Sequence, residues 1–289
     1  MHLAHPEFAP DASLSREEME ELQHEVADAA IFEDAFEFDP ESVRAEPTDD
    51  AQTHLPTGED EDKDEDENED EDDDSDVAVP TESPESPVVV GVDQAFVGDL
   101  AVSAVVASRD GEVVERAHAA VETEIPYIPG LLSFREGTAI LRAFEELTVE
   151  PDLAIVDGSG RIHFREAGIA THIGVMLDLP AIGVAKNLLC GDLRDPPEGH
   201  MAEGDRVPVV ANSRVGAPDG TVIGYALQSR QYPNPETRHV NPLYVSPGHR
   251  VSAETAAELV WRLCAGYKLP EPTRRADAYA DEVKETVDT

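Results

Sequence analysis

The sequence has few lysines, few cysteines and no long apolar run. Only 4 of its 289 residues are Lys, against 17 Arg. No stretch of about 18 apolar residues occurs, so no membrane-spanning helix is expected. The first residues lack the features of a secretory signal, and we expect a cytoplasmic protein. Cys190 and Cys264 are the only cysteines and lie in no CxxC or Cys/His cluster, which argues against a disulfide framework or a structural zinc site.

Acidic residues dominate the composition. The chain holds 63 Asp and Glu against 21 Lys and Arg, a net charge of −42, and residues 1–86 alone hold 33 acidic and 3 basic residues. Acidic excess with scarce Lys is typical of salt-loving archaea, whose molar salt shortens the Debye length to about 3 Å. In such a cell an acidic protein can still bind nucleic acid, because the binding then depends on metals and specific contacts rather than on a basic surface.

The charge divides the chain into three parts. Residues 1–86 form an acidic, largely disordered extension, residues 87–270 a folded domain, and residues 271–289 a polar, frayed tail. Residues 58–76 contain no apolar side chain and cannot bury surface. Ser15 followed by Glu18 predicts a capping box and a short acidic helix. The acidic arm serves solubility in salt, or it contacts basic partners or the active-site groove.

The pattern of the folded part changes from strands alone to strands alternating with helices. Three strands come first, with Asp110-Gly111 as the turn between the second and third. We expect strands at 87–96, 101–108, 113–122, 152–158, 181–187, 221–229 and 242–248, and helices at 134–147, 166–179 and 252–264, the last capped by Ser252. Residues 191–220 read as a polar stretch rich in Pro and Gly. This order predicts an α/β domain of three layers, with a mixed central sheet flanked by helices.

Three carboxylates are candidates for a catalytic metal site. Asp93 and Asp157 end apolar strands, where a charge is costly unless it is paired or bound to metal, and Glu136 lies on the helix between them. Converging carboxylates bind hard cations such as Mg²⁺, and a metal-bound water can attack a phosphodiester. From the residues alone, capping of the next element is the more common role of an aspartate at a strand end.

Longer segments carry a resemblance to a known family. VVVGVDQAF is followed by PYIPGLLSFREG (126–137), IVDGSGRIHFREAGIATHIGV (155–175), DLPAIGVAKNLLCG (178–191) and YVSPGHRVS (244–252). In order and spacing these segments resemble endonuclease V over residues 88–265. That family cuts nucleic acid near hypoxanthine, the base of inosine. The resemblance implies a ribonuclease H-like fold and does not extend to the acidic N-terminus.

The resemblance also assigns roles to residues. Asp93, Glu136 and Asp157 match the carboxylates that bind Mg²⁺, with Mn²⁺ as a substitute. Lys186 matches a basic position beside the metals that contacts the scissile phosphate, and His249 a histidine near the metal site that positions water or metal. The segment that wedges into the helix is Pro126, Tyr127, Ile128 and Pro129, and an apolar wedge suits the gap left by an extruded base. The base pocket is Gly130, Leu132, Gly158 and His163.

Two positions depart from the family pattern, and plainer interpretations stand beside the functional ones. Ser159 replaces a histidine and Phe164 a proline, which suggests looser lesion selectivity. Tyr127 could be a surface aromatic in a turn, Lys186 a lysine whose stem covers apolar surface, and His249 a turn residue. Gly130 and Gly158 could be conformational glycines that relieve backbone strain and have no part in binding. His172 is expected to be a satisfied packing residue rather than a site residue.

The sequence therefore predicts a Mg²⁺-dependent, monomeric endonuclease that repairs deaminated adenine in DNA. It is expected to cut the second phosphodiester bond 3′ to inosine and to leave 3′-hydroxyl and 5′-phosphate ends. The alternatives are an inosine-specific ribonuclease, a less specific ribonuclease H-like nuclease, and a binding module that does not cleave.

Overall fold

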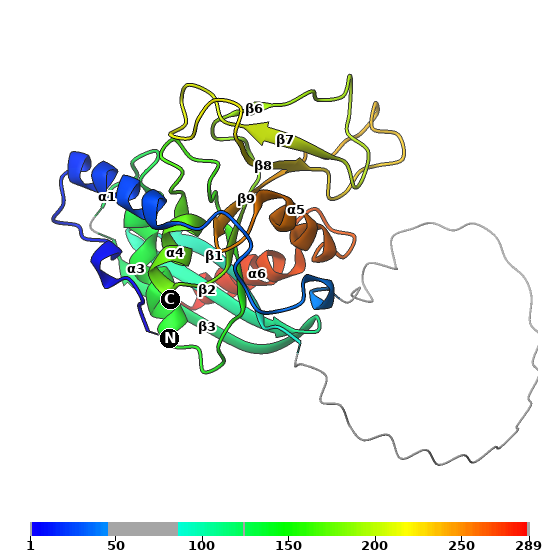
Figure 1. The fold of residues 1–289 in the computed structure, drawn as a ribbon. Helices are drawn as coiled ribbons and strands as arrows, with labels where there is room; N and C mark the ends of the chain where they lie inside the picture. Colours follow the sequence, from blue (N-terminus) through cyan, green and yellow to red (C-terminus); the bar gives the residue numbers. More distant parts are fainter. Residues whose placement is uncertain (1, 46–85, 124, 288–289) are drawn as a thin grey trace, which may run out of the picture.

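A single mixed β-sheet organises the molecule. The computed structural model describes residues 2–45, 86–123 and 125–287. Its nine strands lie in the order β3-β2-β1-β4-β5-β9-β8-β7-β6 (Figure 1). Their bounds are β1 Val89–Val97, β2 Leu100–Arg109, β3 Glu112–Glu122, β4 Leu153–Asp157, β5 Ala181–Ala185, β6 Asp192–Leu193, β7 Arg206–Val210, β8 Val222–Leu227 and β9 Leu243–His249.

The first half of the sheet confirms the predicted topology. β1, β2 and β3 form an antiparallel meander, and Asp110 and Gly111 turn between β2 and β3 with φ of 53° and 80°. Positive φ at both positions is what a tight hairpin needs. β4 and β5 then join β1 in parallel. A meander followed by parallel strands with helical crossovers is the ribonuclease H-like fold that was expected.

Helices cover both faces of the sheet, as Figure 1 shows. α3 (Leu132–Glu145) and α4 (Ile169–Leu177) lie on one face, and α5 (Ala253–Arg262) and α6 (Glu271–Val287) on the other. Alternate residues of β1 and β4 serve the two cores: Val90 and Val92 pack toward α3 and α4, whereas Val89, Leu153 and Ile155 pack in the cluster that includes α5. Burial on both faces explains why these strands read as unbroken apolar runs.

The structure corrects the prediction for residues 191–220. They contain β6 and β7, which extend the sheet beyond β8 (Figure 1). β7 was missed because Pro208 interrupts its short run of valines, and Pro normally counts against a strand. Ser252 caps α5 as predicted, with its hydroxyl accepting from the Thr255 N–H.

Residues 2–45 pack against the folded domain. α1 (Arg16–Ala29) has the predicted capping box between Ser15 and Glu18, and it lies beside α4 (Figure 1). Two 3₁₀ turns flank it, η1 (Pro6–Phe8) and η2 (Pro40–Ser42). Val26 is fully buried in the core cluster under α3 and α4. The prediction of a largely disordered extension is therefore wrong for this part, because a few apolar side chains anchor it; residues 58–76 lie outside the described residues.

The prediction of a frayed C-terminal tail is wrong. Residues 271–287 form α6, the longest helix in the described part of the chain, and it packs on β1 and β2. After the first turn, its buried residues are Ala276, Ala280 and Val283, which recur at helical spacing but are too few and too small to stand out as an apolar pattern. In the part of the chain that the structure describes, no helix has the length and apolar character needed to cross a membrane.

Candidate active site

Sheet register brings Asp93 and Asp157 together. β1 and β4 run parallel with Val92 opposite Val156, so the next residue of each strand is an aspartate. Asp93 follows Val89 and Gly91 on one face of β1, and Asp157 follows Leu153 and Ile155 on the same face of β4. Two carboxylates far apart in sequence thus meet in the interior of the sheet, Asp157 at the end of β4 and Asp93 in the middle of β1.

α6 adds a third carboxylate that the sequence analysis did not identify. Gly91 lets this helix approach, because a Cβ on it would overlap the Pro272 carbonyl. Five residues further along α6 is Asp277, whose negative charge acts on Asp93. The residue was missed because the segment was interpreted as a tail. The available signal was the helical spacing of Ala276, Ala280 and Val283 around it.

The electrostatics confirm that these acids crowd one another. Burial, followed by the charges of Asp157 and Asp277, raises the pKa of Asp93 to about 8. Burial raises the pKa of Glu136 to about 7, with Asp157 adding to the effect and Arg135 opposing it. Asp93 and Glu136 therefore resist ionisation next to the other acids unless a cation joins them.

Lys186 is the cation nearest to the aspartates. It follows β5 directly, and its Nζ donates to Asp157 Oδ2 at 3.2 Å. Burial lowers its pKa, but the charges of Asp157, Asp277 and Asp93 outweigh this and hold the pKa above its usual value. Lys186 is therefore positively charged beside the carboxylates, where the sequence placed it.

The chemistry of the donors fits a divalent cation. Asp93, Asp157, Asp277 and Glu136 offer only hard oxygen ligands, which Mg²⁺ and Mn²⁺ prefer. Lys186 beside Asp157 and the charge of Arg135 on Glu136 do not balance the four acids, because the pKa values of Asp93 and Glu136 stay raised. Within the described ranges no three Asp, Glu, His or Cys side chains are already spaced as a formed metal site. The group is close enough to interact electrostatically, and a bound cation would have to draw it together.

A pocket of about 120 Å³ opens beside the carboxylates. Glu136 and Asp157 lie in its wall, so the acids and the pocket share one site. The other lining residues are Gln23, Tyr127, Pro129, Gly130, Leu132, Ser133, Gly158, Ser159, His163, Gly168, Ile169 and Leu189. All four residues predicted for the base pocket line it.

The predicted wedge stands at the rim of this pocket. Pro126, Tyr127, Ile128 and Pro129 form the loop between β3 and α3. Tyr127 is 63% exposed, although large aromatic side chains are usually buried, whereas Ile128 packs partly on the cluster around Leu131 and Phe134. The loop is thus anchored by one side chain and presents another to solvent.

Backbone geometry requires glycine at two positions of the pocket, and hydrogen bonds fix the side chain of His163. Gly130 has φ of 83°, and Gly158, with φ of 147°, has no room for a Cβ against the Ile169 side chain. His163 is buried, its Nδ1 accepts from the Arg165 N–H and its Nε2 donates to the Gly130 carbonyl at 3.1 Å. Burial lowers the pKa of His163 to about 4, so the ring is neutral and holds the pocket loop in place.

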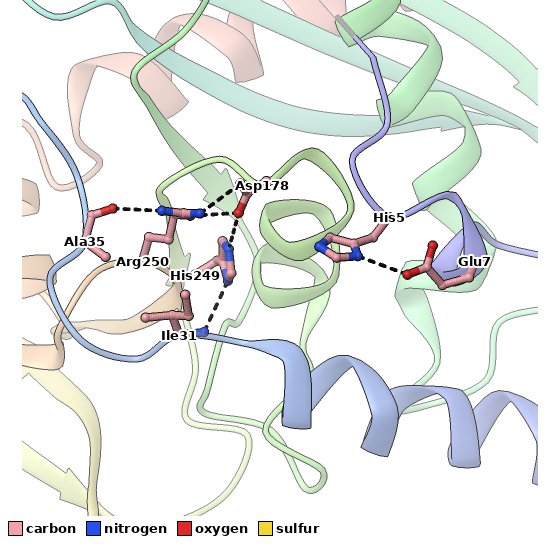
Figure 2. Close-up of polar contacts among 7 residues, drawn as sticks. All are labelled: His5, Glu7, Ile31, Ala35, Asp178, His249 and Arg250. Carbon is pink, nitrogen blue, oxygen red and sulfur yellow. Dashed lines mark hydrogen bonds and ion pairs between the residues drawn. The ribbon is translucent and has the colours of Figure 1, made fainter.

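His249 is not at the carboxylates, which corrects its predicted place near the metals. It pairs with Ala181 at the start of β5, whereas Lys186 follows the end of that strand. Figure 2 shows its contacts: Nε2 donates to Asp178 Oδ1 at 3.1 Å, and Nδ1 accepts from the Ile31 N–H at 3.2 Å. The neighbouring Arg250 holds Asp178 with two hydrogen bonds. These residues fasten the segment that follows α1.

The remaining predicted residues also have defined places. His172 is fully buried, with Nε2 donating to the Phe8 carbonyl at 2.7 Å and its ring edge-on to Phe134, as a packing residue would be. The prediction that its polar atoms are satisfied is wrong for Nδ1, which is buried and has no hydrogen-bond partner within the described residues. Ser159 lies in the pocket wall. Phe164 packs beside the cluster of Ile162 and its neighbours.

Fold and site together define a metal-dependent type of nuclease with ribonuclease H-like architecture. Comparison with known proteins narrows this class. The family model for endonuclease V matches residues 74–278. Endonuclease V of the archaeon Haloarcula marismortui is 56% identical over 100% of this chain and 99% of its own length. The chain belongs to the endonuclease V family and is an endonuclease.

Solved structures agree. The crystal structure of endonuclease V from Streptomyces avermitilis superposes with a TM-score of 0.69 at 28% identity, covering 95% of each chain. Endonuclease V of Ciona intestinalis, solved with a 24mer DNA containing an inosine followed by a ribo-adenosine, has a TM-score of 0.56 at 25% identity. The match covers 70% of this chain and 87% of the Ciona chain.

Proposed function

We propose that this protein cuts nucleic acid at the second phosphodiester bond 3′ to an inosine, with Mg²⁺ as its metal. The observation that carries the proposal is that Glu136 and Asp157 line the same pocket as Gly130, Gly158 and His163. A base held in that pocket lies next to the carboxylates that would act on its strand. The DNA bound by the Ciona protein contains inosine, which supports this choice of base.

The chain's own residues divide the work of hydrolysis. Asp93, Asp157, Asp277 and Glu136 would hold the divalent cation, which supplies charge for the phosphodiester and lowers the pKa of water. Lys186, positively charged beside Asp157, neutralises a non-bridging phosphate oxygen. Cleavage with the 3′ oxygen as leaving group gives 3′-hydroxyl and 5′-phosphate ends.

Base extrusion is assigned to the loop before α3. Tyr127, exposed at the rim, occupies the gap in the stack once the base has left it. The pocket itself offers the N–H groups at the start of α3, where Leu131 provides no side-chain cap. Uncapped N–H groups of a helix can donate to the O6 of hypoxanthine.

The proposal includes a role in repair of deaminated adenine, by a monomer in the cytoplasm. Two alternatives within the family are an inosine-specific ribonuclease and a less selective nuclease. Ser159 and Phe164, the two departures from the family pattern, bear on selectivity because Ser159 lines the pocket. A binding module without cleavage is disfavoured by the complete set of carboxylates.

Matched oligonucleotides test these options directly. DNA and RNA strands that differ only by one inosine or adenosine are incubated with the full chain in molar KCl and Mg²⁺, with EDTA as control. We expect cuts at the second phosphodiester bond 3′ to the inosine. No cut is expected in strands that carry adenosine instead, or in the presence of EDTA. Cutting of the adenosine strands at the same rate would reject inosine selectivity, and preference for RNA would select the ribonuclease alternative.

A further inference from the structure

The N-terminal helix reaches the base pocket through one residue. Gln23 of α1 lines the pocket although it lies more than 100 residues before the other lining positions. It is 1% exposed, which is rare for a polar side chain in an amphipathic surface helix. The segment that carries it belongs to the acidic extension, for which the sequence suggested solubility in salt or contact with basic partners or with the active-site groove, but no residue that would make such a contact.

Hydrogen bonds fix the orientation of its amide. Gln23 Nε2 donates to the Gly130 carbonyl at 3.0 Å and to the Ala167 carbonyl at 3.1 Å. Carbonyls only accept, so the nitrogen of the amide must face them. The two carbonyls belong to two different loops of the pocket, one before α3 and one before α4. Gln23 therefore joins both walls.

This orientation leaves the amide oxygen without a partner. Gln23 Oε1 is buried and accepts no hydrogen bond. Buried polar atoms are almost always satisfied, and an exception calls for an explanation. Because both donor positions are used on the protein, Oε1 is the only polar atom that this pocket residue has left for a ligand.

The helix is held firmly enough to position such an acceptor. Met19, one turn before Gln23, packs in the cluster with Leu131 and Phe134, directly behind the wedge loop. Glu20 accepts from Arg165 at 2.7 Å, and Arg165 lies in the loop before α4. An acceptor fixed in advance loses little entropy when it binds a donor.

We propose that Gln23 is a specificity-determining residue, whose Oε1 accepts a hydrogen bond from the N1–H of the extruded base. This inference rests on the proposed function and assigns part of the base selection to the N-terminal extension. Hypoxanthine carries a proton on N1, whereas adenine has a lone pair there. Adenine would leave Oε1 buried and unpaired and bring a second acceptor against it, so the contact rejects the undamaged base.

The test compares bases that differ at this atom. Affinity of the full chain is measured in EDTA for oligonucleotides carrying inosine, adenosine or nebularine, the unsubstituted purine without the N1 proton or O6. Wild type is compared with Gln23→Met, which keeps the length but removes the polar atoms, and with Gln23→Ala. His24→Met, at the exposed neighbouring position of the same helix, is the matched control.

We expect the inosine-to-nebularine affinity ratio to fall about tenfold in both Gln23 variants and to stay at the wild-type value in His24→Met, since one hydrogen bond is lost. The ratio is measured on one preparation, so partial unfolding does not change it. Equal weakening for inosine and nebularine would overturn the inference, because Gln23 would then only brace the pocket. A wild type that does not prefer inosine to adenosine would instead overturn the proposed function itself.

Discussion

Replacing Asp93 with Asn should stabilise the metal-free protein while it removes activity. Asp93 is 8% exposed and faces Asp157 and Asp277, so its ionised form is strained in the absence of a cation. The amide has nearly the same shape and carries no charge. Function and stability therefore pull in opposite directions at this residue, as they often do in active sites.

The size and the pH range of the effect follow from the pKa. Burial and the neighbouring acids raise the pKa of Asp93 from 3.8 to about 8. Above pH 3.8 the unfolded chain releases this proton while the folded protein keeps it, so stability falls as the pH rises toward 8. About four pH units at 1.4 kcal/mol each give about 6 kcal/mol. This is an upper value, because the amide must also be desolvated.

Urea unfolding at pH 4, 6 and 8, in high KCl with EDTA, measures the difference. We expect Asp93→Asn to match wild type at pH 4 and to be more stable by several kcal/mol at pH 8, and Mg²⁺ to narrow the gap by stabilising only wild type. Asp99→Asn, at an exposed position, is the control and should show no such trend. A variant less stable than wild type at pH 8 would refute the idea that the acids repel one another.

Three other predictions concern the wedge and two histidines. Tyr127→Ala should weaken binding to inosine-containing duplex about tenfold, since stacking on an aromatic side chain contributes about 1–3 kcal/mol; unchanged affinity in a gel-shift titration would remove the wedge role. His249→Gln should lower the free energy of unfolding by about 1–3 kcal/mol through its contacts to Ile31 and Asp178 while cleavage changes less than about threefold. A hundredfold slower but folded variant would return His249 to the active site. Burial lowers the pKa of His172 to about 4, below its unfolded value of 6.5. The neutral ring therefore contributes fully to the free energy of unfolding above pH 6.5, and about 3 kcal/mol of that free energy is lost as the pH falls to 4. His172→Gln should flatten that part of the stability curve, and an unchanged slope would contradict the assignment.

The sequence revealed those features of the fold that depend on large apolar side chains. The strands through Val92, Val105 and Ile155 are long buried runs, and they were found with nearly the right bounds. α6 was missed because its buried face offers only two alanines and one valine as apolar side chains beyond the first turn, and β7 because of Pro208. In both, packing against the sheet outweighs a weak local signal.

The candidate site could be predicted where a motif adjoins a strand end or a turn. Asp157 stood out as an acid at the end of an apolar strand, whereas Lys186 and Gly158 were assigned through the resemblance of their segments to the family. Asp277 and Gln23 reach the site only because α6 and α1 fold back on the domain, which no local pattern reveals. His249 lies in a motif that resembles the family, yet the antiparallel direction of β9 places it at the opposite end of β5.

Cleavage by Asp157→Ala tests the central claim most directly, because this carboxylate joins the acid cluster, Lys186 and the base pocket. Wild type and variant are given the same inosine-containing strand in Mg²⁺, and binding is measured in EDTA. The account predicts that the variant no longer cuts and still binds the inosine strand with nearly wild-type affinity. Equal cutting by the two proteins would contradict it.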